Sequence, residues 1–115
     1  MLISSAASQI GLKNHGAISA AKAGVIGLTK STAATYANKN IRINAVAPGL
    51  VESNLSKALL SSDMARKASE TLHALGRVGQ PNEIASIISW LIEEEQQWIT
   101  GQVFTVDGGL SSIKV

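Results

Sequence analysis

The chain has no cysteine, few aromatic residues and no long apolar run. The absence of cysteine excludes disulfides and thiolate metal sites, and it is compatible with a reducing cytoplasm. Aromatic residues make up only 3% of the 115 residues, so the core must be built from Ala, Ile, Leu and Val, as expected where helices pack closely on a parallel sheet. No apolar run approaches the roughly 20 residues that span a bilayer, and the first residues lack the basic and apolar segments of a signal peptide. We therefore predict a cytoplasmic protein without a membrane partner.

An excess of charge of one sign is also missing. The net charge is +2, and the ten Lys and Arg residues are scattered rather than gathered into a basic stripe, so we predict no nucleic-acid partner. His15 and His73 match no metal-ligand spacing with each other or with carboxylates, so we predict no metal site and a surface position for both. With 45% hydrophobic and 16% charged residues, the chain has the composition of one modest globular domain over residues 1–115.

Alternating and helical patterns predict an α/β fold. We expect parallel strands at residues 1–4, 41–47 and 103–106, a long helix at 16–38, short helical patterns at 57–60 and 65–75, and a helix that begins at Pro81. The last helix has a buried stripe at Ile84, Ile87, Ile88 and Leu91, and the acidic run at 93–95 opposes its dipole, so we expect it to fray there. The first strand, the long helix and the second strand predict a right-handed βαβ unit.

Ligands of open α/β sheets bind beyond the carboxyl ends of the strands. In this chain those ends are Ser4–Ser5, Pro48–Gly49 and Asp107–Gly109, which we expect to converge on one edge of the sheet. The Ser-rich segment 50–75 follows the second of these ends and could fold over a cleft as a lid. Small residues surround Lys22 near the start of the long helix and leave room for a ligand against the backbone.

The motifs at these strand ends resemble the short-chain dehydrogenase/reductase family, and most closely its 3-oxoacyl-acyl-carrier-protein reductase-like branch. The first match is a spacing: Ser5 lies thirteen residues before position 18, and Lys22 lies four residues after it. The other matching residues are Asn44 with Pro48 and Gly49, then Arg77, Gly79, Pro81 and Glu83, and finally the stretch from Ile99 to Gly109. The resemblance covers essentially the whole chain. It implies a Rossmann-like three-layer α/β/α fold, of which this chain is the C-terminal half of a doubly wound parallel sheet with three strands and flanking helices.

The resemblance also implies site roles and an NAD or NADP cofactor. In the family, the residue at Ser5 hydrogen-bonds the substrate carbonyl or hydroxyl, and Lys22 stands where a lysine holds the ribose hydroxyls and lowers the pKa of a tyrosine. Pro48 and Gly49 match the segment that lines the nicotinamide, and Val51 and Ser53 occupy positions that contact its carboxamide. The implied substrate is a small carbonyl compound or secondary alcohol. Ser5 would also fit a simple turn cap, and the thirteen-residue spacing is our reason to favour the site.

Position 18 departs from the family pattern, because isoleucine stands where the catalytic tyrosine is expected. Isoleucine has no proton to give, and a well-placed acid or base contributes about 10² to 10⁴ in rate. The only tyrosine, Tyr36, lies eighteen residues further along the predicted helix, roughly 27 Å away at 1.5 Å per residue. We therefore expect the chain alone to be inactive.

The glycine-rich cofactor loop of the family's first half has no counterpart in this sequence. We expect the chain alone to bind dinucleotide feebly or not at all. We expect a truncated or split gene product, or a misassigned start, and a homo-oligomer or a complementary N-terminal half that covers the open edge of the first strand. The alternative is a non-catalytic remnant that serves as an oligomerisation or interaction module through helix 16–38 and the last helix and strand. Ile18 favours this alternative, whereas Ser5, Lys22 and Pro48–Gly49 favour the reductase.

Overall fold

The computed structural model describes residues 1–114 and contains a sheet of three parallel strands. The strands are β1 (Leu2–Ile3), β2 (Ala45–Pro48) and β3 (Val103–Val106), and the α-helices are α1 (Gly16–Tyr36), α2 (Asp63–Thr71) and α3 (Pro81–Ile92). Short 3₁₀ helices lie at Ala6–Ser8 (η1), Ala37–Lys39 (η2) and Glu94–Gln96 (η3). The predicted parallel α/β architecture is confirmed.

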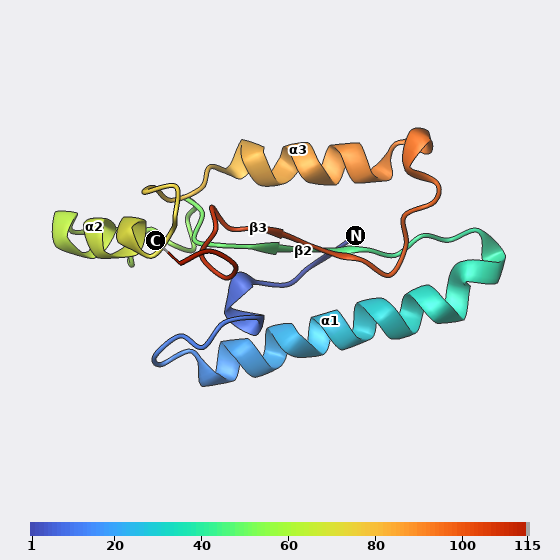
Figure 1. The fold of residues 1–115 in the computed structure, drawn as a ribbon, viewed down its shortest axis with the longest axis horizontal. Helices are drawn as coiled ribbons and strands as arrows, with labels where there is room; N and C mark the ends of the chain where they lie inside the picture. Colours follow the sequence, from blue (N-terminus) through green and yellow to red (C-terminus); the bar gives the residue numbers. More distant parts are fainter. Residues whose placement is uncertain (115) are drawn as a thin grey trace.

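The sheet is the middle of three layers. Helix α1 covers one face, α3 covers the other, and α2 lies beyond the end of the sheet toward which β2 and β3 point (Figure 1). The strands follow one another in the order β1-β2-β3, so β1 is an edge strand. This arrangement confirms the Rossmann-like α/β/α fold class.

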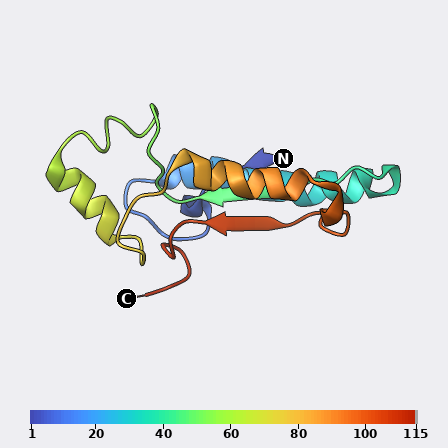
Figure 2. The same ribbon diagram turned by 90° about the horizontal axis from the view of Figure 1, so that it is seen from above.

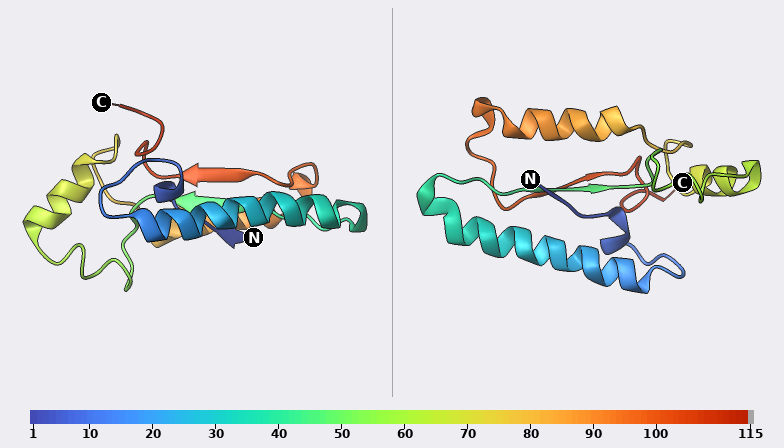
Figure 3. Two further views of the ribbon diagram at one scale, coloured as in Figure 1. Left: turned by 90° about the horizontal axis from the view of Figure 1, so that it is seen from below. Right: turned by 180° about the vertical axis from the view of Figure 1, so that it is seen from behind.

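The two strand-to-strand crossovers have opposite hands. Both step in the same direction across the sheet, from β1 to β2 and from β2 to β3, yet α1 and α3 lie on opposite faces (Figures 2 and 3). The unit β1-α1-β2 is right-handed, as predicted, whereas the unit β2-α3-β3 is left-handed. Nearly all parallel crossovers are right-handed, so general rules would place α3 on the wrong face.

The core lies around the central strand. Ala45, Val46 and Ala47 of β2 are fully buried, because helices cover both faces of the parallel sheet. Thr29 of α1 and Leu91 of α3 are buried against them from the two sides. Alanine lets the helices approach the sheet closely, which explains how a chain so poor in aromatic residues closes a core.

The helix boundaries follow the signals in the sequence. Asn40 takes the left-handed conformation (φ 57°) just after α1 and η2. Pro81 occupies the first turn of α3, where the carboxylate of Glu83 accepts a hydrogen bond from the backbone N–H of Gln80 at 2.7 Å. Helix α3 ends at Ile92, directly before the acidic run, as the opposing dipole predicts.

Several predicted elements differ from the structure. The first strand is Leu2–Ile3 rather than 1–4, the long helix ends at Tyr36 rather than at residue 38, and the helix predicted at 65–75 spans Asp63–Thr71. The second strand begins at Ala45 rather than at residue 41, because the residues before it bond to side chains, including the N–H of Ile43 to the Thr100 hydroxyl at 3.0 Å. The predicted helical pattern at 57–60 is a series of turns. There Ser56 donates to the carbonyl of Val51 at 2.6 Å, and such side-chain bonds compete with helix formation.

Within residues 1–114, no helix is both long enough and apolar enough to cross a bilayer. The same residues contain no group of three or more His, Asp or Glu side chains that could hold a metal ion.

Candidate cofactor-facing cleft

The carboxyl ends of the strands meet at one edge of the sheet, where a cleft of about 510 Å³ opens. Ser5 and Ile18 line this cleft together with Pro48 and Gly49. Leu59, Leu72 and His73 of segment 50–75 form part of the same wall. The structure therefore brings together four of the predicted site positions, which come from three different parts of the chain.

Ser5 caps a turn and also lines the cleft. Its side-chain oxygen accepts a hydrogen bond from the Ala7 N–H at 3.2 Å, which caps the short helix η1. That bond leaves the hydroxyl hydrogen free for donation, and the residue is half-buried on the wall of the cleft. A turn cap and a donor to a ligand oxygen are thus compatible at this position.

Ile18 presents hydrocarbon to the cleft from the start of α1. Its side chain is 43% exposed, so the surface at this point is apolar and has no ionisable group. One turn later, the ammonium of Lys22 donates to the carbonyl of Ile3 at 3.0 Å. Lys22 therefore points to the edge strand β1, while the hydroxyl of Ser5 is bonded to η1.

Gly49 is required by the crowding at the end of β2. A Cβ at this position would lie 2.9 Å from both the Cα of Asp107 and the Nε2 of His73. Pro48 and Gly49 also line a second cavity of about 450 Å³, together with Val51 and Ser53. Four of the five predicted cofactor-facing residues thus lie on segment 48–53, where Pro48 and Gly49 border both spaces, whereas Lys22, the fifth, lines neither of them.

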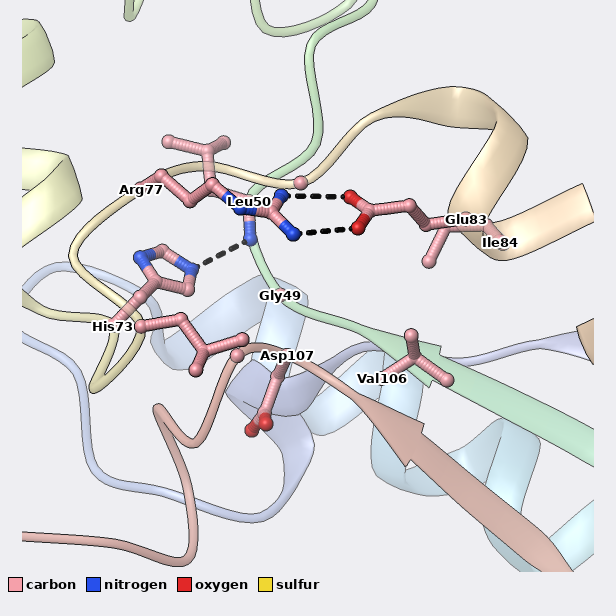
Figure 4. A pocket seen from close by; sticks show the side chains of 11 residues that line it. Gly49, Leu50, His73, Arg77, Glu83, Ile84, Val106 and Asp107 are labelled. Carbon is pink, nitrogen blue, oxygen red and sulfur yellow. Dashed lines mark hydrogen bonds and ion pairs between the residues drawn. The ribbon is translucent and has the colours of Figure 1, made fainter.

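His73 is buried, so the prediction of a surface position for it is wrong. Only 3% of the residue is exposed, and both ring nitrogens have backbone partners. Nδ1 pairs with the carbonyl of Ser69, and Nε2 accepts from the N–H of Leu50, the bond drawn in Figure 4. His15 is exposed, as predicted. No spacing rule could have found the role of His73, because its partners are backbone groups brought in by the fold.

Asp107 closes the turn after β3. Its carboxylate accepts hydrogen bonds from the Gly109 N–H at 2.9 Å and from the N–H and hydroxyl of Ser111 at 2.8 and 2.6 Å. Burial would raise the pKa of Asp107, but the bonds from Ser111 and Gly109, aided by nearby His73, more than offset it and lower that pKa. Gly108 and Gly109 have positive φ (58° and 87°), as expected for this glycine turn.

An ion pair lines a smaller cavity of about 100 Å³, which Leu50 also borders (Figure 4). The guanidinium of Arg77 donates to both carboxylate oxygens of Glu83, at 2.9 and 2.6 Å. These bonds and the bond from the Gln80 N–H lower the pKa of Glu83 to about 2. The pair fixes the start of α3 to the loop before it.

Comparison with known proteins decides the family. The family model described as enoyl-(acyl carrier protein) reductase matches residues 1–111. The chain belongs to the short-chain dehydrogenase/reductase family. It is 46% identical over 91 residues to the 3-oxoacyl-acyl-carrier-protein reductase of Thermotoga maritima, an alignment that covers 79% of this chain and 36% of the relative.

Solved structures of the family share the fold. A 4-hydroxyisoleucine dehydrogenase complexed with NADH is 31% identical, with a TM-score of 0.91 over 97% of this chain and 46% of that one. ElxO with NADP bound is 33% identical, with a TM-score of 0.88 over 96% of this chain and 45% of that one. The chain thus spans less than half the length of these relatives.

Proposed function

We propose that this chain forms the substrate-side, nicotinamide-facing part of an NAD(P)-dependent oxidoreductase that acts on a carbonyl compound or a secondary alcohol. The observation that carries the proposal is the cleft at the carboxyl ends of the strands, where Ser5, Ile18, Pro48 and Gly49 meet. The relatives whose names record oxo-group reduction or hydroxyl oxidation support the substrate class, and those with bound NADH or NADP support the cofactor class.

The residues present fit such a site in part. Ser5 has a hydroxyl hydrogen to donate to a substrate oxygen, and the backbone of Pro48 and Gly49 offers a wall without bulky side chains. Val51 is held in place because its neighbours Leu50 and Glu52 form backbone hydrogen bonds with Gly79, both at 2.9 Å. Bound nicotinamide would supply or accept the hydride. Lys22 would have to exchange the carbonyl of Ile3 for the ribose hydroxyls.

Position 18 decides whether the cleft can complete the reaction. A carbonyl that accepts a hydride needs a proton, and the hydrocarbon of Ile18 supplies none. We propose that the chain is inactive for this reason, and that it acts with a complementary N-terminal half or a second copy that supplies the cofactor-binding remainder. In this proposal the partner determines the oligomeric state, and segment 50–75 determines which substrates fit.

The test is to restore the tyrosine. Ile18→Tyr is mixed with a separately expressed first half of a related reductase, and NAD(P)H oxidation is followed with a carbonyl substrate. Leu28→Tyr is the matched control, because it places a phenol on the exposed part of the same helix, away from the cleft residues. Turnover in the mixture that contains Ile18→Tyr, but not in the native or Leu28→Tyr mixtures, supports the proposal. Turnover by the native mixture would show that Ile18 does not block the reaction, and no turnover with Ile18→Tyr would contradict a reductase cleft.

A further inference from the structure

His73 lies at the junction of three parts of the fold. It lies two residues after the end of α2, it is almost completely buried, and both of its ring nitrogens are within hydrogen-bond distance of backbone groups. The Nδ1 atom lies 2.8 Å from the carbonyl oxygen of Ser69, and the Nε2 atom lies 3.2 Å from the backbone nitrogen of Leu50. The imidazole therefore links the last turn of α2 to the residue that follows Pro48–Gly49 (Figure 4).

These two partners assign one protonation state. A carbonyl oxygen can only accept, so Nδ1 must carry a hydrogen, and a backbone N–H can only donate, so Nε2 must present its lone pair. The ring is thus neutral, with the hydrogen on Nδ1. A second proton would turn Nε2 into a donor that faces another donor, and the bond to Leu50 would be lost.

The surroundings leave this ring little freedom. Gly49 passes so close that a Cβ there would contact Nε2, and a Cβ at Gly108 would lie 3.5 Å from the Cβ of His73. Two residues after His73, the N–H of Leu75 donates to the carbonyl of Gly108 at 3.0 Å. The end of segment 50–75 is therefore fixed to the exits of both β2 and β3, with His73 between them.

Charged and titratable groups face His73 from several sides. They are Asp107 after β3, Arg77 and Glu83 in the small cavity, and Lys13 and His15 across the cleft. The carboxylate of Asp107 is already bonded to Gly109 and Ser111, and Arg77 and Glu83 bond each other. Their pairing leaves the Leu50 amide as the partner of Nε2.

We propose that His73 is a positioning residue that holds the Leu50 backbone, and with it the cofactor-facing wall of the cleft, only in its neutral Nδ1–H form. Protonation of the ring releases Leu50 and the end of segment 50–75 together. That this wall faces a cofactor rests on the proposed function. The link between His73 and Leu50, and the loss of that link in acid, do not depend on the proposed function.

Nuclear magnetic resonance of the ¹⁵N-labelled full chain tests the proposal without any turnover. We expect a scalar coupling across the N–H···N bond between the Leu50 amide and Nε2 of His73, and ring shifts of the Nδ1–H tautomer. On acidification, the coupling should vanish once the ring carries a second proton. The protection factor of the Leu50 amide, which corrects the exchange rate for its intrinsic dependence on pH, should then fall by about five- to tenfold, the loss of one net hydrogen bond. An absent coupling at neutral pH, an Nε2–H tautomer or a Leu50 protection factor that does not change when the ring is protonated would overturn the proposal.

Variants separate this role from simple packing. His73→Leu keeps a side chain of similar size but cannot accept from Leu50, so the protection factor of Leu50 should be low at every pH. His73→Gln offers both an acceptor and a donor, so the protection factor of Leu50 should be higher than in His73→Leu and should not change with pH. His15→Gln is the matched control, because His15 is exposed and should leave the Leu50 profile unchanged. Equal exchange in His73→Leu and the native chain would contradict the proposal, whereas a failed reductase assay with an intact His73 coupling would count only against the proposed function.

Discussion

Replacing Gly49 with alanine should destabilise the chain because the new methyl group has no space. The added Cβ would lie 2.9 Å from the Cα of Asp107, 2.9 Å from the Nε2 of His73 and 3.0 Å from the Cβ of Asp107. Two of these atoms belong to Asp107, directly after β3, and the third is held by its bond to Leu50, so none can move away cheaply. Overpacking of this kind costs about 1–3 kcal/mol.

The same substitution at Gly24 should have the opposite sign. Gly24 lies inside α1, and a Cβ there meets nothing within 4 Å. Alanine favours the helix by about 0.5–1 kcal/mol over glycine, so Gly24→Ala should stabilise the chain. The assay is urea unfolding followed by circular dichroism, with the midpoints of both variants compared with the native chain. A Gly49→Ala midpoint equal to or above the native value would refute the steric argument.

Three further substitutions test the core, a buried polar bridge and the ion pair. Leu91→Ala empties a site that is only 1% exposed and should lower the unfolding free energy by about 2–5 kcal/mol in the same urea assay. Asn44→Ala should cost about 1–3 kcal/mol and quicken exchange at Gln102, because it removes the oxygen that accepts from the Gln102 N–H at 3.0 Å. Glu83→Gln should be less stable than the native chain at neutral pH. That difference should shrink as pH falls from the ordinary 4.5 through about 2, where Glu83 gains its proton and its pair with Arg77 weakens. A difference that persists in strong acid would contradict the ion-pair explanation.

Elements with local signals could be predicted from the sequence. Pro81 and the apolar stripe that follows it mark α3, and Asn40 marks the end of the long helix region. The strand Val103–Val106 was also predicted at its observed bounds. In each case the determining residues are neighbours in the chain, so periodicity and capping contain enough information.

Features that depend on distant residues could not be predicted in the same way. The start of β2 is set by side chains near residue 100, and the left-handed crossover places α3 against a rule that local patterns cannot override. The buried state of His73 depends on Leu50 and Ser69, one of which is 23 residues away. The converging strand ends were predicted because topology alone places them at one edge, whereas the cleft's hydrogen bonds required coordinates.

The identity of residue 18 and the structure of the cleft are physically independent. Gly49, His73 and Asp107 hold the strand exits through close contacts and backbone hydrogen bonds, and none of these bonds involves position 18. Ile18 is 43% exposed, so a tyrosine there can extend into the cleft without overpacking the core. Surface substitutions of this kind change stability by about 0.5 kcal/mol or less, so Ile18→Tyr should unfold at nearly the native urea midpoint. A large shift would mean that the hydrocarbon of Ile18 supports the fold, and the restored-tyrosine experiment would then report on stability as well as on chemistry.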